Sequence, residues 1–267
     1  ASKVLRIQQP AISRMVQQLE DNLGFKLFEK VGRNVQLTGQ GREVFERSQK
    51  IFGEVEQLQM SLGEISGECK GPLWIGASDP IASHFIPSHL QSYLEKYPKV
   101  YPNIFSGPAT TIFEKLINGK VEMGMFFHIP DLPDKLEIFK KIETRFRLVV
   151  RKDLRANKNI LQSFIGSREI DDTSTRKFPT LDRLRKDHPL AKITISSNNL
   201  TAHKNMVLQG LGVSILPDFL VKDELQKGLL TEVYPKENFL FDMRLIKRQT
   251  TPLSLNAREF LNKIQSV

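Results

Sequence analysis

The sequence is poor in cysteine and has no long apolar run. Cys69 is the single cysteine in 267 residues, which excludes an internal disulfide framework and suits a reducing compartment. The longest apolar runs, residues 146–150 and 211–217, are far shorter than the roughly 20 residues that cross a bilayer, so we expect no membrane span and no membrane partner. Lys3 and Arg6 are not followed by an apolar segment with a small-residue cleavage site. A secretory signal is therefore not expected, and a cytoplasmic location is predicted.

The sequence also lacks the residue spacings of common catalytic and metal sites. Its five histidines show no His-x-x-x-His spacing, which argues against a metal site. Ser78, Asp79 and His84 do not lie in the Gly-x-Ser-x-Gly turn of a hydrolase, and no Walker loop or dinucleotide fingerprint is present. Cys69 is interpreted as inert rather than redox-sensing. We therefore expect no metal, no cofactor and no enzymatic activity.

A positive charge is the first feature that is present. The formal net charge is +9 and the sequence pI is about 9.6, which favours nucleic acid, an acidic membrane or an acidic metabolite as partner. Residues 1–42 hold seven Lys or Arg against three acidic residues. This denser excess indicates that a polyanion binds near the start of the chain.

Residues 9–23 have the pattern of a short helix. Pro10 is tolerated in the first turn of a helix, and Gly24 suits a left-handed stop. Apolar residues at helical spacing predict one buried stripe, made of Ile12, Val16, Leu19 and Leu23. Another face carries amides, a hydroxyl and a guanidinium but no carboxylate, from Gln9, Ser13, Arg14, Gln17 and Gln18.

A hairpin and a long helix are expected next. Residues 26–30 and 35–37 predict two strands that bracket a turn of Gly32, Arg33 and Asn34. Thr38 is a good N-cap for a helix over residues 39–66. Its seam alternates by four and three residues and predicts a partner helix: Val44, Ser48, Ile51, Val55, Leu58, Leu62 and Ile65. Packing of this stripe within its own domain is the alternative.

From residue 71 the pattern changes to alternating strands and helices. Strands are expected at 73–77, 100–105, 121–127, 193–197 and 213–216, and helices at 81–96, 110–118, 200–209 and 254–264. This alternation predicts an α/β fold with a mostly parallel sheet, divided into two lobes because each set of strands is short. Residues 152–190 have no clear pattern.

The segment from Gln9 to Glu20, continued through Leu27 and Phe28 to Gly32, Arg33, Leu37, Thr38 and Gly41, closely resembles the signature of LysR-type transcription regulators. The resemblance extends over residues 71–267, through Gly76, Ser78, Tyr97-Pro98, Gly119, Gly210 and Pro217, and is weakest over 152–190. Gln8 departs from the family, which often has a Ser cap at that position.

The resemblance implies an α/β protein with an N-terminal all-α winged helix-turn-helix and a periplasmic-binding-protein-like effector domain of two α/β lobes. The expected domains are residues 1–38 for DNA binding, with the first helix and part of the next missing at the start, 39–70 for an antiparallel dimer helix, and 71–267 for the effector. Lobe I would hold residues 71–147 and 219–267, and lobe II residues 148–218. The resemblance also implies dimers assembled into tetramers, with RNA polymerase as a further partner.

For DNA we expect contacts from Gln9, Pro10, Ser13, Arg14, Gln17, Gln18, Arg33 and Asn34, because amides pair with adenine, Arg with guanine or phosphate, and Ser with phosphate oxygens. A merely solvated helix face is the alternative. The dimer would bury Val44, Ile51, Val55, Leu58, Leu62 and Ile65.

For the effector we expect a site between the lobes, at strand ends and helix starts. Its candidates are Ser78, Asp79, Gly107, Pro108, Thr110, Phe127, His128, Asn198, Asn199 and Thr201, with Phe126 an alternative to Phe127. The alternative is that these residues are only caps and turns. No arginine lies in these segments, so an anionic effector would be held by backbone N–H groups and hydroxyls, with an apolar part against Phe126 or Phe127. The expected ligand is a small carboxylate or an aromatic metabolite. The rival to a ligand-responsive regulator is a solute-binding or enzymatic α/β protein with an incidental helical N-terminus.

Overall fold

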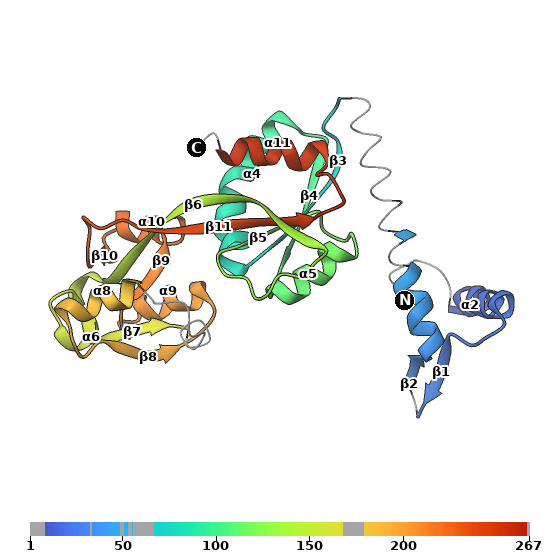
Figure 1. Ribbon diagram of the computed structural model, residues 1–267, viewed down its shortest axis with the longest axis horizontal. Coiled ribbons are helices and arrows are strands. Elements are labelled where there is room, and N and C mark those ends of the chain that lie inside the picture. The colour runs from blue at the N-terminus through green and yellow to red at the C-terminus, as the bar shows by residue number, and fades with distance from the viewer. Residues whose placement is uncertain are drawn as a thin grey trace. The chain divides into compact units, whose positions relative to one another are not determined.

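A computed structural model describes residues 9–32, 34–48, 51–52, 55, 67–167 and 179–265. The chain divides into an N-terminal unit, Ala1–Gln59, and a C-terminal unit, Met60–Val267. Each unit is described by itself (Figure 1). Among the described residues, no helix combines the length and the apolar character that crossing a membrane requires.

The N-terminal unit consists of a helix, a hairpin and the start of a second helix. Helix α2 covers Gln9–Leu23 and ends where Gly24 adopts a φ of 77°, as expected from the sequence. Strands β1 (Phe28–Val31) and β2 (Asn34–Leu37) pair antiparallel and leave two residues, Gly32 and Arg33, as their connection. Residues 39–48 are helical, as are 51–52 and 55.

The apolar stripe of α2 is less buried than its spacing predicts. Ile12 and Val16 are half-buried, but Leu19 and Leu23 are 45% and 39% exposed. The prediction of one buried stripe is therefore wrong for its second half. The physical reason is that the described part of this unit has a very small core, in which Leu27 is the one buried large hydrophobic residue.

The C-terminal unit is built on one long mixed sheet. Its strand order is β10-β6-β11-β5-β3-β4, and β9 pairs with β6 beside this path. Only β3 with β4 and β3 with β5 are parallel, so the expectation of a mostly parallel sheet is wrong. The strands are β3 (Gly71–Ala77), β4 (Val100–Ser106), β5 (Met123–Phe126), β6 (Leu136–Arg151), β9 (Ser214–Pro217), β10 (Leu230–Glu232) and β11 (Phe239–Arg248).

Lobe I has helices on both faces of β3, β4 and β5. Helices α4 (Ile86–Lys96) and α11 (Leu255–Gln265) cover one face and bury Tyr93 and Phe260. Helix α5 (Ala109–Ile117) covers the other face through Ile112, Phe113 and Leu116. A single π-helical turn, η1 (Ile81–Phe85), leads into α4. Figure 1 shows the three-layer arrangement.

Lobe II repeats this three-layer plan. Helices α6 (Lys158–Gln162) and α8 (Pro179–Asp187) cover one core, and helices α9 (Leu200–Leu208) and α10 (Asp218–Gln226) cover another. Strands β7 (Ser163–Gly166) and β8 (Lys192–Ser196) pair in parallel, and a bridge from Phe164 to Val213 places β7 beside β9. A 3-10 turn, η2 (Lys152–Leu154), precedes α6.

The chain passes between the lobes twice, along the paired strands β6 and β11. The return crossing comes later than the expected boundary at residue 219. Helix α10 packs Leu220 and Val221 in the lobe II core, and β10 pairs with the lobe II end of β6. Leu220, Val221 and Leu230 pack in the lobe II core, so lobe II extends past residue 218, while Phe219 of the same helix also contacts lobe I.

Candidate nucleic-acid interface and effector site

The polar face of α2 is open to solvent. Its residues lie in two neighbouring rows spaced four residues apart, which is the spacing that places side chains on one side of a helix. All six expected contact residues on this helix are exposed: Gln9, Pro10, Ser13, Arg14, Gln17 and Gln18. Together they present amides, a hydroxyl and one guanidinium, which can donate to phosphates and base edges.

Glu20 is the carboxylate of α2 that turns inward, and the sequence analysis did not single it out. It is 7% exposed, and its Oε1 accepts hydrogen bonds from the backbone N–H of Leu27 (2.7 Å) and Phe28 (3.2 Å). Its Oε2 accepts from Lys26 Nζ at 2.8 Å. The Lys26 hydrogen bond and then the Leu27 N–H lower the pKa of Glu20. Glu20 continues the spacing of Ile12 and Val16, a signal that it points toward the core.

Thr38 joins the hairpin to the helix that follows. Its Oγ1 accepts from the N–H of Gly41 at 2.8 Å, which confirms the expected N-cap, and it donates to the carbonyl of Lys26 at 2.7 Å. Gly41 packs so closely that a Cβ there would lie 2.0 Å from the carbonyl oxygen of Leu27. Glu20 and Thr38 thus hold the same short segment from opposite sides and fix α2 relative to the hairpin.

Two of the predicted interfaces are only partly within the described residues. Asn34 is exposed at the start of β2, whereas Arg33 lies outside the described residues. In the second helix Ile51 and Val55 are 63% and 46% exposed, and Val44 is half-buried. Leu58, Leu62 and Ile65 lie outside the described residues. Ile51 and Val55 are thus not buried against the described part of their own unit.

The sequence analysis missed two aromatic residues of this second helix. Phe45 and Phe52 are 51% and 68% exposed, and they are seven residues apart, so they extend the apolar face. Their spacing in the sequence carried the signal. They widen the surface that a partner helix would cover.

The expected lobe I residues gather at one edge of the sheet. Ser78 and Asp79 follow β3, Gly107 follows β4, and Phe127 follows β5, and these three strands are neighbours. The N–H of Ser78 donates to the carbonyl of Met125 at 3.1 Å, and that of Gly107 donates to the carbonyl of Ala77 at 3.3 Å. Pro108, Thr110 and His128 are exposed at the same strand ends.

The lobe II residues lie at the start of α9. Asn199 caps this helix, since its Oδ1 accepts from the N–H of Ala202 at 2.8 Å, and Asn198 is exposed before it. Thr201 reaches across to lobe I, where its hydroxyl donates to Asp79 Oδ2 at 2.7 Å. Ser83 donates to the other oxygen of Asp79 at 3.3 Å. Asp79 and Thr201 are 122 positions apart in the chain, and both were among the residues expected at the effector site.

An aromatic cluster also joins the lobes. Phe127 stacks on Phe219 of α10 with ring centroids 6.1 Å apart, and its edge meets Phe146 at 4.9 Å. Phe219 also contacts Phe85 of η1. Phe126 faces the other way, where it is 1% exposed beside Phe113, so it is excluded as a ligand contact. Phe219 and Phe85 were not predicted as site residues, because an aromatic residue within a helix usually belongs to the hydrophobic core.

His203 is a buried histidine at the first turn of α9. Its Nε2 donates to the carbonyl of Ser197 at 2.8 Å, and its Nδ1 lies 3.3 Å from Ser214 Oγ. Burial lowers the pKa of this imidazole. It ties the start of α9 to β8 and β9, as a core histidine would. Among the described residues no group of three or more His, Cys, Asp or Glu is placed to hold a metal ion.

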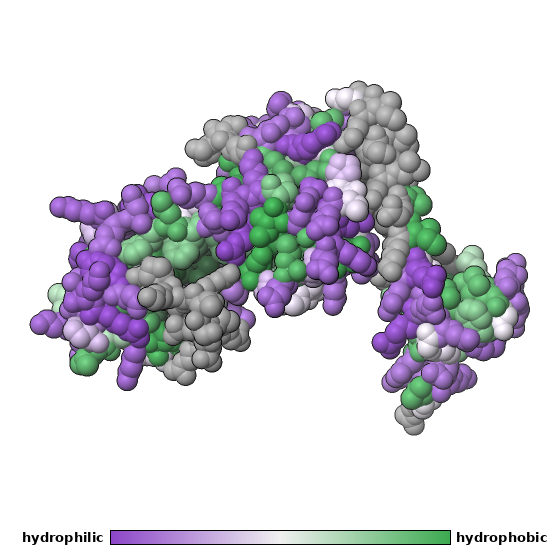
Figure 2. Space-filling model, viewed as in Figure 1, coloured by the Kyte–Doolittle hydropathy of each residue, from purple (hydrophilic) through white to green (hydrophobic). Residues whose placement is uncertain are grey.

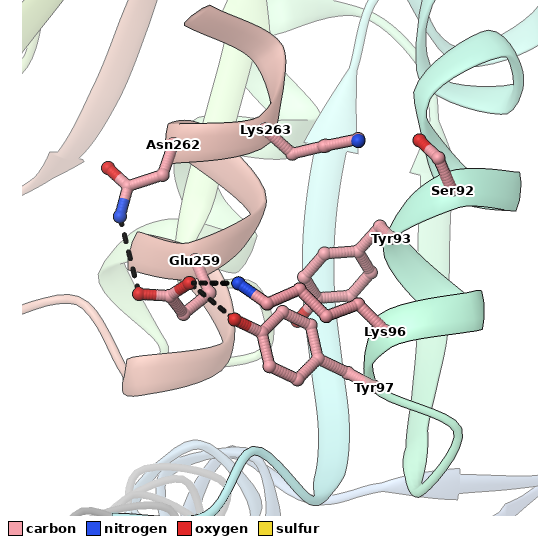
Figure 3. A pocket seen from close by; sticks show the side chains of 7 residues that line it. All are labelled: Ser92, Tyr93, Lys96, Tyr97, Glu259, Asn262 and Lys263. Carbon is pink, nitrogen blue, oxygen red and sulfur yellow. Dashed lines mark hydrogen bonds and ion pairs between the residues drawn. The ribbon is translucent and has the colours of Figure 1, made fainter. Parts of the chain in front are cut away.

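A separate pocket lies in lobe I between α4 and α11 (Figure 3). It contains none of the expected site residues; its lining is Ser92, Tyr93, Lys96, Tyr97, Glu259, Asn262 and Lys263. The Tyr97 hydroxyl donates to Glu259 at 2.5 Å, and Lys96 lies 3.7 Å from the same carboxylate. The Tyr97 hydrogen bond lowers the pKa of Glu259. Lys96, Tyr97 and Glu259 thus hold one another at this pocket.

Comparison with known proteins agrees with both parts of this description. The family model "LysR substrate binding domain" matches residues 66–267, and "Bacterial regulatory helix-turn-helix protein, lysR family" matches residues 1–42. The HTH-type transcriptional regulator YwqM of Bacillus subtilis (strain 168) is 24% identical over 242 residues, which is 87% of this chain and 80% of YwqM.

Solved structures share the fold. Full-length CbnR, a structure with its target DNA, has a TM-score of 0.64 at 17% identity and covers 99% of this chain and 92% of CbnR. Full-length LysG of Corynebacterium glutamicum, with bound effector Arg, has a TM-score of 0.54 at 16% identity, covering 99% and 90%. The two family models account for most of the sequence, and the chain therefore belongs to the LysR family of bacterial transcription regulators, with a helix-turn-helix DNA-binding domain followed by an effector-binding domain of two α/β lobes.

Proposed function

We propose that this regulator reads duplex DNA through α2 and its hairpin, and that a small molecule bound between the lobes controls its activity. One observation carries the DNA-reading assignment: Glu20 of α2 turns inward, and the helix from Gln9 to Gln18 presents amide, hydroxyl and guanidinium groups outward, with the exposed carboxylate of Asp21 only in the last turn. A major groove admits a helix and offers acceptors to such donors. Gln9, Gln17 and Gln18 would pair with bases, Arg14 with guanine or phosphate, and Ser13 with phosphate.

The effector site is placed where Asp79 and Thr201 meet. Their hydrogen bond joins the carboxyl end of β3 to the start of α9, so a ligand seated there contacts both lobes at once. In α/β sheets ligands bind beyond the carboxyl ends of the strands. A ligand that replaces this bond changes how the lobes are held together, which supplies a route from binding to regulation.

The proposed effector is a small carboxylate or an aromatic metabolite. Hydroxyls of Ser78, Thr110 and Thr201 would receive its polar atoms, and the half-buried Phe127 would contact an apolar part. Asp79 adds a carboxylate that favours a ligand with a hydrogen-bond donor or a cationic group. Arginine, the effector in the LysG structure, combines a carboxylate with such groups. It should therefore be included in the panel of metabolites that is tested first.

The assembly is proposed to be a dimer of dimers that works in the cytoplasm. The exposed apolar residues of the second helix support pairing with a partner helix, since exposed seam residues are unfavourable in water. The proposed domains are residues 1–38, 39–70 and 71–267. Contact with RNA polymerase would follow from DNA-bound regulation and belongs to the same proposal.

Fluorescence anisotropy with the full chain tests the function. Titration into labelled duplex fragments from around its own gene should show DNA binding that weakens as salt is raised. Adding the metabolite panel should shift the affinity or footprint for one class of compound. A chain that binds metabolites but no duplex DNA would instead be a solute-binding or enzymatic α/β protein.

A further inference from the structure

The positive charge of the chain lies mostly outside the DNA-reading part. Residues 71–267 hold 29 Lys and Arg against 21 Asp and Glu, an excess of 8, whereas residues 1–38 hold 6 against 3, an excess of 3. The excess is concentrated further within lobe II. Residues 151–167 and 179–210 hold nine basic against three acidic residues. The start of the sequence led us to expect an excess of positive charge near α2. A second and larger excess therefore lies in lobe II.

We group five of these cations, all on or beside elements that border one core, under the name basic face of lobe II. They lie on η2, α6, α8 and β8 or directly beside them, and these elements contribute Leu154, Leu161, Leu184 and Ile193 to one shared core or its border. All five side chains are exposed: Lys152, Arg155, Lys158, Lys186 and Lys192. Figure 2 shows hydrophilic side chains projecting from this end of the C-terminal unit.

The acidic residues of this region are already paired with other arginines. Asp153 pairs with Arg151 at 2.7 Å, Asp187 pairs with Arg183 at 2.9 Å, and Asp182 lies 3.4 Å from Arg185. Within the described ranges, none of the five residues of the basic face forms an ion pair. No described carboxylate neutralises these five charges, and Arg155 in addition donates to the carbonyl of Val233 at 3.3 Å.

The chemistry of the face favours a phosphate backbone over an acidic protein. A protein interface has an apolar or aromatic centre, but Leu190 is the one exposed large hydrophobic residue among the described residues between 151 and 196. Contacts with a phosphate backbone need only Lys and Arg and carry no sequence information. DNA bound through α2 of the same chain would be present at a raised effective concentration at the other surfaces that it can reach.

We propose that the basic face of lobe II binds the backbone of duplex DNA outside the segment read by α2. The inference rests on the proposed DNA binding and adds a sequence-independent contact by the effector-binding domain. Such a contact increases the number of phosphates neutralised, and hence the steepness with which affinity falls as salt rises.

The test compares two triple variants of the full chain. One is Lys158→Gln, Lys186→Gln and Lys192→Gln on the basic face; the other is Lys120→Gln, Lys135→Gln and Lys222→Gln, which are equally exposed elsewhere and remove the same charge. Anisotropy is recorded against sodium chloride on a short random-sequence duplex and on one several times longer. On the long duplex the first variant should lose about 3 units of the log–log salt slope, about one for each phosphate contact.

The control triple should keep the wild-type slope on both duplexes. A variant with Lys158→Arg, Lys186→Arg and Lys192→Arg retains the charge and should behave as wild type. Equal slopes for the two Gln triples on the long duplex would overturn the inference, including the case in which the face serves an acidic protein. A wild-type chain that binds neither duplex would instead remove the proposed function itself.

Discussion

Glu20 fixes the direction in which α2 presents its polar face. Its carboxylate accepts three hydrogen bonds from the segment that follows the helix. A buried N–H that loses its acceptor costs free energy unless water replaces it. A single side chain therefore links the DNA-reading helix to the hairpin, although it touches no DNA in our proposal.

Glu20→Gln should lower the melting temperature of the N-terminal unit and remove a pH dependence. The folded pKa of Glu20 lies below its ordinary value of 4.5, because Lys26 and the Leu27 N–H favour the ionised form. The carboxylate thus contributes stability above that value, and the contribution is lost as the pH falls through the folded pKa. Thermal melts across the acidic range check this. Glu29→Gln, an exposed carboxyl of β1, is the control and should leave the acid profile unchanged.

Arg14→Ala should weaken DNA binding without unfolding the protein. Losing one guanidinium contact to a base or phosphate costs about 1–3 kcal/mol, and the side chain is exposed, so no core contact is lost with it. Anisotropy on a bound fragment measures the effect. Arg47→Ala removes the same charge from the second helix, where Arg47 pairs with Glu43 at 2.7 Å, and should have little effect. Unchanged affinity in Arg14→Ala would remove this residue from the interface.

At the scale of elements, the junction between the hairpin and the second helix tolerates no added side chain. Gly41→Ala should destabilise the N-terminal unit, since its Cβ would meet the Leu27 carbonyl oxygen and the backbone would have to move. Overpacking of this kind costs about 1–3 kcal/mol. Gly39→Ala, two residues earlier with nothing within 4 Å of its Cβ, should be neutral or stabilising. Denaturant unfolding of both variants checks the contrast, and equal stabilities would contradict it.

The second helix should lose its partner when a charge enters its seam. Ile51→Asp should shift the sedimentation profile toward monomer, because a carboxylate between two helices is left without water or a counter-ion. Leu58→Asp should do the same if that residue continues the seam. Glu46→Gln alters the charge on another side of the helix and should leave the assembly intact. An Ile51→Asp protein that still sediments as a dimer through this helix would refute the seam.

Local rules predicted the elements of the DNA-reading unit and of lobe I well. In the DNA-reading unit, Pro10, Gly24 and Thr38 mark the ends of helices through backbone preferences that do not depend on the fold. The structure confirms Gly24 as a helix stop and Thr38 as an N-cap. Neither of the two long strands that join the lobes, β6 and β11, was predicted. Each passes from one lobe core to another, so its buried face changes partners midway and the alternation of apolar residues breaks down.

The residues of the candidate site also fall into those that local sequence predicts and those that depend on tertiary packing. Ser78, Asp79 and Thr201 could be named because strand ends and helix starts carry recognisable residues, and their neighbourhood follows from strand order. Phe219 could not be named in this way. Its role comes from the docking of α10 near η1 and Phe127, which depends on contacts between segments far apart in sequence.

For the whole molecule, the effector site should respond at both lobes. Ser78→Ala and Thr201→Val each remove one hydroxyl and should weaken effector binding by about 0.5–1.5 kcal/mol, the net value of one hydrogen bond. Calorimetry with the full chain and the metabolite panel measures this. Thr250→Val serves as control. Thr250 lies in the turn after β11, at the end of the sheet opposite to the carboxyl ends of β3 and β5. A ligand that alters DNA binding yet keeps full affinity in both variants would move the site elsewhere.

Because β6 and β11 are the two connections between the lobes, lobe II is an insertion within the chain of lobe I. Its chain enters along one strand and leaves along the other, and the two strands are held by a ladder from Leu136 with Arg248 to Phe146 with Phe239, with one shift of register between Leu245 and Ile246. One backbone cut inside lobe II therefore leaves both fragments attached to lobe I. Release of lobe II by a protease requires two cuts, one in each strand, and a truncation from the C-terminus damages lobe I before it reaches lobe II.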